Sequence, residues 1–475
     1  MTEPHELSAA EQLRALRSGE ISSLELTRHY LTRIGELDGA LGAFVTVTPE
    51  LAIGEAARAD RLLARGDRSP LLGLPLGIKD LNATAGIRTT SGSAALDDHV
   101  PAQDAWTVGL LRRAGAVVVG KTNVPEFGVT CFTENNVTGR PAVTPYDPSR
   151  YSSGSSGGAA TAVAAGMLPV AHGSDGAGSG RTPAATCHLV AVKPSRGLVS
   201  LAPVTSFFSP GIETPIARTV PDAALLLDVM AQPWPGDLHG WHPGQSFADT
   251  IRRSPSGGLR IAMWTETGMD GIDPHPEAVR AAERAANLLR ELGHDVQEIP
   301  IPARYTEPVR RAIVLWFEVR TAAMVPALVP PGRQDLLMPY TRYLLAAGRT
   351  RSGTDVELGQ AALAQYASTF LDALAGFDVA LTPTTNGPAV PIGHYLSDGV
   401  EQVPDRMLAW SCHTPWANFT GAPAVALPSH QDSGGLPVGV QLVGRPRHDG
   451  PLLALAAQLE RAGLWADAHP PCWHQ

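Results

Sequence analysis

The sequence predicts an α/β protein in which a central β-sheet is covered by helices. Two observations carry this prediction. Short apolar runs bounded by Gly or Pro, such as LGLPLGI and AGAVVVG, have the length of buried strands. Helical patterns such as DAWTVGLLRRA and GGAATAVAAGM lie between such runs, and this alternation is typical of a sheet with helices on its faces.

The composition excludes several classes of protein. The chain has 475 residues, of which 44% are hydrophobic and 17% charged, so it has enough apolar side chains for a large core. The net charge of −9 and the lack of a long basic run argue against nucleic acid as a partner. Four well-separated cysteines argue against a disulfide scaffold or a metal knuckle. No apolar leader or 18-residue apolar stretch is visible, so we expect a cytoplasmic protein without a membrane span.

Residues 1–70 are expected to form a helical arm. Ser8 with Glu11 and Ser22 with Glu25 each make a capping box at a helix start. Residues 71–230 are rich in Gly, Ser, Ala and Thr and hold the further strand-like runs AVAAGMLPVA and LVAVKP. The break at 251–258 is interpreted as a surface loop within one sheet domain that spans 1–475.

The second half of the chain alternates again. LRIAMW, the helix over 276–293 and HDVQEIPIP form one β-α-β unit, and Gly293 caps the helix at its C-terminal end. Residues 300–375 are expected to be mostly helical. FDVALTPTT, APAVALPSH and PVGVQLVGR read as strands, and GPLLALAAQLERAG as a closing helix.

Three residues stand out as candidates for chemistry: Lys79 in GLPLGIKDL, Ser155 in SSGSSGGAA, and Ser179 in HGSDGAGSGRTPAA. Neither Gly-rich loop contains GK[ST] or a well-placed GxGxxG, so phosphate and dinucleotide sites are poorly supported. The segment from Gly154 to Gly158 matches the nucleophile elbow G-x-S-x-G, but the polar PYDPSRYSS before it is no strand.

These residues lie in blocks that resemble the amidase signature family of serine hydrolases. The blocks are GLPLGIKD, KTNVPEFG, TENN…DPSR, SSGSSGGAA, GSDGAGSGRTPAA, VKPSRGLVS, PIARTVPDAALLLDVM, FDVALTPTT and GLPVGVQLVGRP. They follow the family's order over roughly residues 5–465. The resemblance implies the amidase signature fold, with a mixed, mostly parallel sheet and helices on both faces. It assigns 71–230 to the core with the catalytic loops and 300–375 to a variable region that shapes the substrate site.

The resemblance also implies a catalytic triad. Ser179 is the nucleophile, Ser155 is a bridging serine after a cis peptide bond at Gly154, and Lys79 is the base. The spacing of the two serines agrees with the family. The backbone N–H groups of Gly176, Ala177, Gly178 and Ser179 form an oxyanion hole. Ser156, Asp175 and Arg181 are supporting residues that hold the loops.

A lysine acts as a base only when it is neutral, so its pKa of about 10.4 must fall to roughly 7–8. The apolar run 74–78 before Lys79 supplies the burial that lowers the pKa. If Lys79 ends a strand, Asp80 points to the opposite face and leaves this effect in place. Two departures from the family stand in the nucleophile loop: Gly176-Ala177 replaces Thr-Gly, and Gly180 replaces Ile.

The substrate is less defined by the sequence. Val129, Thr130 and Cys131 match the family strip that touches the substrate near its carbonyl. Several aromatic residues are candidates to line an apolar or aryl-accepting pocket, with Phe207 and Trp316 proposed as substrate contacts. The others are Phe208, Phe317, Tyr340, Tyr343, Trp410 and Trp416. His172 is expected to be structural.

The resemblance implies hydrolysis of an amide-type C–N bond through an acyl-enzyme on Ser179. Small aryl or alkyl amides and anilides are the expected substrates, with aryl esters and carbamates (urethanes) chemically close. No metal or cofactor is implied, and a homodimer is compatible with the sequence. Three alternatives stay open: a glutamine amidotransferase subunit, a biosynthetic acyltransferase, and a non-catalytic binding protein.

Overall fold

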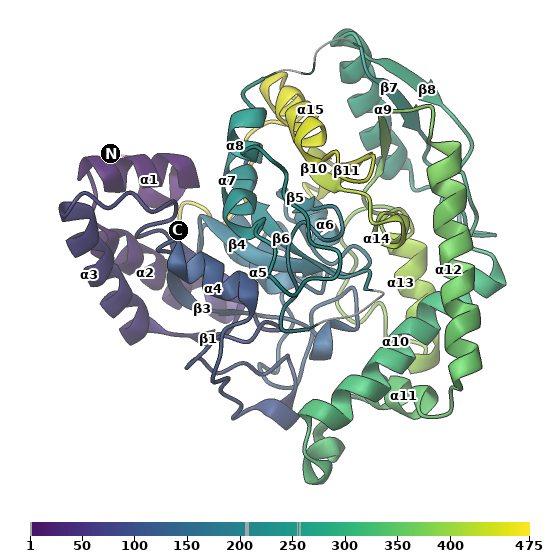
Figure 1. Ribbon diagram of the computed structural model, residues 1–475, viewed down its shortest axis with the longest axis horizontal. Coiled ribbons are helices and arrows are strands. Elements are labelled where there is room, and N and C mark those ends of the chain that lie inside the picture. Colours follow the sequence, from purple (N-terminus) through teal and green to yellow (C-terminus); the bar gives the residue numbers. More distant parts are fainter. Residues whose placement is uncertain (1, 205–208, 254, 256–257) are drawn as a thin grey trace.

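A single β-sheet runs through the computed structural model, which describes residues 2–204, 209–253, 255 and 258–475 (Figure 1). The strand order within these residues is β1-β3-β2-β4-β6-β5-β10-β11-β9-β7-β8. The strands are β1 Phe44–Val47, β2 Pro75–Lys79, β3 Val117–Thr122, β4 Val170–Asp175, β5 Val190–Lys193, β6 Ile212–Ala217, β7 Arg260–Met263, β8 Asp295–Glu298, β9 Val379–Pro383, β10 Ala424–Gln431 and β11 Pro437–Gly444.

The sheet is mixed, as expected, but the expectation that it is mostly parallel is wrong. Of the ten neighbouring pairs among the described strands, six are antiparallel. One cause is β6, which lies between β4 and β5 and runs antiparallel to both. The other is the tight hairpin that joins β10 to β11, because strands joined by so short a turn must be antiparallel.

Helices cover both faces of the sheet, as the sequence predicts. Side chains alternate across a strand, so Val190 and Val192 of β5 enter one hydrophobic core and Ala191 enters the other. The helices are α1 Ala9–Ser18, α2 Ser23–Leu41, α3 Pro49–Ala64, α4 Trp106–Arg113, α5 Gly157–Ala164, α6 Arg181–Thr186, α7 Val220–Met230, α8 Phe247–Thr250, α9 Pro276–Glu291, α10 Glu307–Leu328, α11 Pro339–Gly348, α12 Gly353–Ala373, α13 Val403–Ser411, α14 Pro415–Thr420 and α15 Asp449–Arg461. No helix among the described residues is long and apolar enough to cross a membrane.

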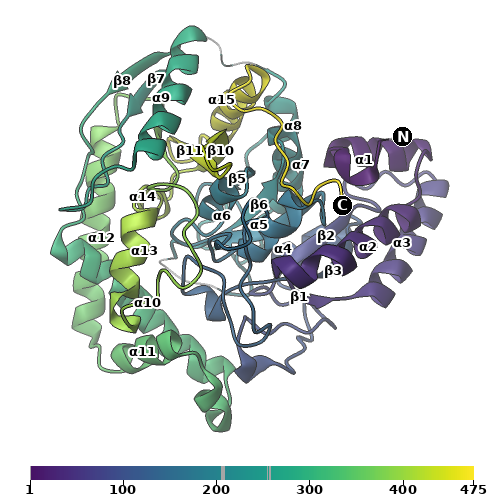
Figure 2. The same ribbon diagram turned by 180° about the vertical axis from the view of Figure 1, so that it is seen from behind.

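Two helical regions lie at opposite ends of the molecule. The arm α1–α3 packs at one end, and α10, α11 and α12, which fill the predicted helical region 300–375, lie at the other (Figure 1). The C-terminal segment returns to the N-terminal arm, where the Trp473 carbonyl lies 3.1 Å from His5 Nε2 (Figure 2). The sheet therefore lies between the N-terminal arm, which the C-terminal segment contacts, and the helices α10–α12, of which α10 lies near the loop that holds Ser179.

Most predicted strands and helices are present, but several strands are shifted or shortened relative to the apolar runs that predict them. Only the last two residues of the run AVAAGMLPVA belong to β4, because its first residues continue α5. The β-α-β unit forms as predicted, with β7 and β8 parallel. The break at 251–258 falls partly on residues 254, 256 and 257, which lie outside the described residues, and the strands on either side of it join one sheet.

Candidate active site

Lys79 is the last residue of β2 and is completely buried. Its Nζ lies 2.8 Å from Ser155 Oγ, 2.7 Å from Ser156 Oγ and 3.2 Å from the Ser174 carbonyl oxygen. Asp80 points elsewhere, as expected for the next residue after a strand, and pairs with Lys121 at 3.5 Å. The lysine is thus enclosed by neutral oxygens rather than by a contacting carboxylate.

Burial lowers the pKa of Lys79 to about 7, against a smaller opposite effect from the charges of Glu213 and Asp175. A neutral amine has two N–H groups and one lone pair. Ser156 Oγ donates to the Ser174 carbonyl, so it accepts from Lys79, and the Ser174 carbonyl accepts the second N–H. The lone pair is then left for the Ser155 hydroxyl. This arrangement suits a base that takes a proton from Ser155.

Ser155 and Ser156 lie where the chain turns into α5. The Gly154–Ser155 peptide bond is cis, which confirms the expectation for this position. Helix α5 packs so closely against its neighbours that a Cβ on Gly158 would lie 2.3 Å from the backbone nitrogen of Asn123. The Ser156 N–H donates to the Ser179 carbonyl at 3.0 Å and so ties the two serine loops together.

Ser179 lies in the loop between β4 and α6, and a buried ion pair holds this loop. Arg181 Nε lies 2.9 Å from Asp175 Oδ2, and both side chains are fully buried. Burial alone would raise the pKa of Asp175, but Arg181 and Asn418 hold it well below its usual range. Asp175 and Arg181 therefore occupy the loop-holding places predicted for them.

The loop N–H groups differ in availability. The Gly178 N–H donates to Asp175 Oδ1 at 2.7 Å, so the prediction that it serves an oxyanion is wrong. Gly178 has a φ of +126°, and a Cβ there would lie 2.2 Å from Thr414 Oγ1. Within the described residues, the N–H groups of Gly176, Ala177 and Ser179 have no hydrogen-bond acceptor. Three of the four predicted donors are thus free for a ligand.

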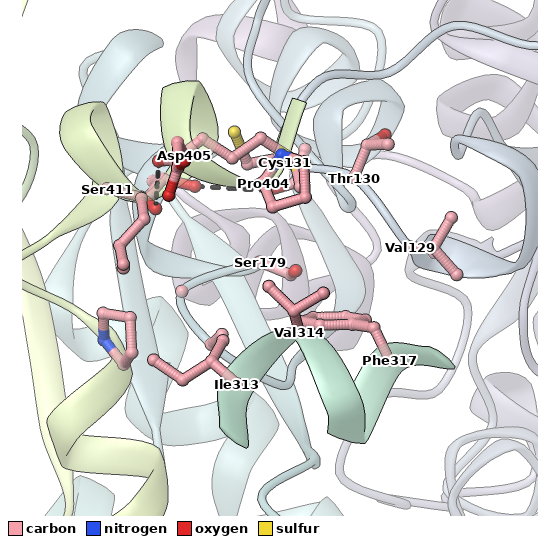
Figure 3. Close-up of a pocket in the computed structure, with 18 of the residues that line it drawn as sticks. Val129, Thr130, Cys131, Ser179, Ile313, Val314, Phe317, Pro404, Asp405 and Ser411 are labelled. Atoms are coloured by element: carbon pink, nitrogen blue, oxygen red, sulfur yellow. Dashed lines mark hydrogen bonds between the residues drawn. The ribbon is translucent and has the colours of Figure 1, made fainter. Parts of the chain in front are cut away.

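A pocket of about 700 Å³, counted out to its open mouth, lies over Ser179 (Figure 3). One wall is the face of α10 formed by Ile313, Val314 and Phe317, and α13 with Asp405 forms part of the opposite wall. The lining residues are Gly128, Val129, Thr130, Cys131, Gly154, Ala177, Gly178, Ser179, Thr182, Arg310, Ile313, Val314, Phe317, Tyr340, Pro404, Asp405, Met407, Leu408, Ser411 and Pro415. Most side chains near Ser179 are apolar, and the charged Arg310 and Asp405 come from α10 and α13.

The predicted substrate contacts divide into three groups. Val129, Thr130 and Cys131 line the pocket. Trp316 does not line it, since its ring lies on another face of α10, near Gly176. Phe207 lies outside the described residues. No hydrogen bond joins the Ser179 and Ser155 hydroxyls in the described part of the chain, and such bonds often form only with substrate bound.

Sequence reasoning placed the substrate-shaping region at 300–375 but did not identify Arg310, Ile313 and Val314 of α10 as pocket residues. The spacing of residues 310, 313, 314 and 317 on this helix is the pattern of one helix face and was the available signal. Phe317 and Tyr340, two of the aromatic candidates, do line the pocket. Cys131 lines the pocket, but burial raises the pKa of its thiol to about 12, which leaves it protonated and unreactive.

The chain matches the model of a known family, described as Amidase, over residues 25–453. The chain belongs to the amidase family. Among curated relatives of this amidase-family chain, a putative amidase AmiB2 of Mycobacterium tuberculosis is 39% identical, over 97% of each chain. A glutamyl-tRNA(Gln) amidotransferase subunit from Roseiflexus is 36% identical, over 99% of each chain.

Solved structures show the same fold. A 6-aminohexanoate cyclic dimer hydrolase in complex with its substrate has a TM-score of 0.91 and 28% identity, over 99% of this chain and 100% of that chain. A bacterial aryl acylamidase of the amidase signature family has a TM-score of 0.87 and 27% identity, over 97% of this chain and 96% of that chain. The protein is therefore an enzyme with the amidase signature fold.

Proposed function

We propose that this amidase-family enzyme hydrolyses small aryl or alkyl amides through an acyl-enzyme on Ser179. The single observation that carries the proposal is the buried Lys79, whose Nζ lies 2.8 Å from Ser155 Oγ. A serine hydroxyl needs a base within reach to attack a carbonyl. A buried, uncharged lysine supplies that base at neutral pH.

The reaction runs in two balanced halves. Ser179 Oγ attacks the substrate carbonyl carbon while its proton passes to Ser155, and the proton of Ser155 passes to Lys79. The free N–H groups of Gly176, Ala177 and Ser179 are the available donors for the oxyanion. When the C–N bond breaks, the leaving nitrogen takes the proton back through Ser155. Water then repeats the same steps on the acyl-enzyme and releases the acid.

The pocket favours an apolar group next to the scissile carbonyl. Val129, Ile313, Val314 and Phe317 surround the approach to Ser179 and offer little to hydrogen-bond a charged group. Anilides, aryl esters and aryl carbamates share the attack and departure steps of an aryl amide. We therefore propose these classes as substrates, with a urethanase or aryl acylamidase activity among them. Cytoplasmic location and a homodimer remain predictions.

A second function is favoured by one specific observation. The 36% identical relative from Roseiflexus is named as a glutamyl-tRNA(Gln) amidotransferase component. Such a protein would release ammonia from glutamine for a partner. Arg310 and Asp405 line the same pocket and carry charges opposite to those of the carboxylate and ammonium of glutamine, but they pair with each other at 3.6 Å. The apolar side chains beside Ser179 favour the first function.

A substrate panel separates the two functions. Purified protein is given an acetanilide, a nitrophenyl ester, benzamide, an aryl carbamate and glutamine, beside Ser179→Ala. We expect turnover of the aryl substrates that disappears in the variant, while thermal unfolding of the variant stays near that of the wild type. Turnover of glutamine alone, or of nothing without a partner protein, would favour the second function.

A further inference from the structure

Glu213 is a buried carboxylate next to the catalytic loops that the proposed mechanism does not use. It lies on β6, and the residue is only 6% exposed. Asn82 Nδ2 donates to its Oε1 at 2.8 Å, and His172 Nε2 lies 3.0 Å from its Oε2. A buried carboxylate is costly unless its partners compensate for lost water. The cost of burying the Glu213 carboxylate therefore needs a functional or structural explanation.

Two links join Glu213 to Lys79. The Asn82 N–H donates to the Lys79 carbonyl at 3.0 Å, so the side chain that binds Glu213 belongs to the turn that follows Lys79. On the other side, Glu213 is the register partner of Ser174, whose carbonyl oxygen lies 3.2 Å from Lys79 Nζ. Glu213 thus contacts both segments that enclose the lysine.

The charge of Glu213 opposes the effect of burial on Lys79. Burial lowers the pKa of this lysine, and the Glu213 carboxylate is the largest influence in the other direction. Asp175 acts in the same sense, but Arg181 lies against its carboxylate and offsets its charge. Unlike Asp175, Glu213 has no arginine within salt-bridge distance in the part of the chain that the structure describes.

We propose that Glu213 is a positioning residue for Lys79: through Asn82 it fixes the turn after the lysine, and its negative charge favours the protonated state that the lysine must reach during the reaction. The inference rests on the proposed function of Lys79 as the base. During the attack of Ser179, Lys79 gains a proton in a buried site whose nearest groups are neutral oxygens. A fixed negative charge nearby stabilises that ammonium group without taking its proton.

Three other charged or titratable groups face this cluster. His172 on β4 contacts Glu213 directly, and Arg320 on α10 is attracted to its charge. Asp175 ends β4. Because the imidazole of His172 contacts Glu213, the test includes a variant that removes it.

The chain offers an unusually direct test, because its only lysines are Lys79, Lys121 and Lys193. Protein labelled with ¹³C at lysine Cε gives three side-chain signals, assigned by one Lys→Met variant each. Their chemical shifts are followed from pH 5 to pH 10 in wild type and in Glu213→Gln. We expect the Lys79 midpoint to fall by roughly one pH unit in the variant, since an opposite charge raises a lysine pKa by about this amount.

Matched variants keep the outcome interpretable. Glu213→Leu removes the charge without adding a buried amide, in case the Gln variant does not fold. Asp222→Asn removes another fully buried carboxylate, which holds the start of α1 far from Lys79, and should leave the midpoint in place. In His172→Gln, which keeps the Glu213 carboxylate, the Lys79 signal should still shift with pH, and its midpoint should lie above that of Glu213→Gln. An unchanged or higher Lys79 midpoint in the folded Glu213 variants would overturn the proposal.

The pH profile of kcat/KM gives a second readout. The acid limb should move to lower pH in Glu213→Gln, and kcat should fall at every pH because the ammonium is less stabilised. A purely structural role would lower activity without moving the limb and would contradict the proposal. Because the lysine signals are read without substrate, an absence of amide hydrolysis would overturn the proposed function separately.

Discussion

In the proposed mechanism Lys79 acts as a base, because burial lets it lose its proton near neutral pH. An arginine in its place stays charged at any usable pH, since the guanidinium pKa exceeds about 12. We predict that Lys79→Arg lowers kcat/KM by about 10³-fold across the pH range. Steady-state kinetics on the best substrate of the panel measure this. Lys193→Met changes another buried lysine, whose Nζ donates to the Pro194 carbonyl and contacts neither Ser155 nor Ser156, and should keep most of the activity.

The residues proposed to react were identified from blocks that resemble a known family, whereas the hydrogen-bond partner of each N–H in the loop could not be predicted. The sequence Gly176-Ala177-Gly178 does not indicate that the Gly178 N–H donates a hydrogen bond to the Asp175 carboxylate. That contact depends on how the loop folds back over α6. For the same reason the sequence did not reveal that Glu213 lies near Lys79, because the two belong to strands separated by β4.

The nucleophile loop makes different demands on its two glycines. A Cβ on Gly178 would meet Thr414 Oγ1 at 2.2 Å, whereas one on Gly176 would meet only the Trp316 ring, at 3.9 Å. We predict that Gly178→Ala lowers kcat/KM by about 10²-fold, because a shift of the loop misplaces Ser179. Gly176→Ala should stay within a few-fold of wild type. Equal losses in both variants would contradict the assignment of these contacts.

The two faces of α10 should contribute differently to substrate binding. Phe317 lines the pocket over Ser179, while its neighbour Trp316 lies on another face. We predict that Phe317→Ala raises KM for an aryl amide roughly tenfold through lost apolar contact, with a smaller effect from Trp316→Ala. Initial rates over a range of substrate concentrations measure KM. A larger effect at Trp316 would restore the original expectation for that residue.

Helices and strands were largely predictable from their apolar runs, but their order in the sheet was not. Val190–Lys193 lies within the predicted run LVAVKP, and Val117–Thr122 begins inside the predicted run AGAVVVG and ends two residues beyond it. The insertion of β6 between β4 and β5 depends on which edges meet during folding, and no local pattern records it. This is why the sheet has more antiparallel pairs than expected.

The three buried lysines also tie the stability of the whole protein to pH. Burial lowers the pKa of Lys79 and Lys193 to about 7 and that of Lys121 to about 8, from 10.5 in each case. At a pH between the lowered pKa of each folded-state lysine and its ordinary value of 10.5, the unfolded chain binds more protons than the folded chain, so the free energy of unfolding rises with pH. We predict that the free energy of unfolding increases from pH 7 to pH 9 and that this increase is smaller in Lys193→Met by on the order of 1–2 kcal/mol. Urea unfolding at each pH measures this, and an unchanged increase in the variant would contradict it.

Every step of the proposed hydrolysis depends on an acyl-enzyme at Ser179, and covalent trapping detects that bond itself. An aryl carbamate whose carbamoyl group leaves slowly is mixed with the protein, and peptide mass spectrometry locates the added mass. We predict one carbamoyl group per chain, on the peptide with Ser179, and none in Ser179→Ala. A carbamoyl group on Ser155 or Cys131, or continued hydrolysis without any modified residue, would show that Ser179 is not the nucleophile.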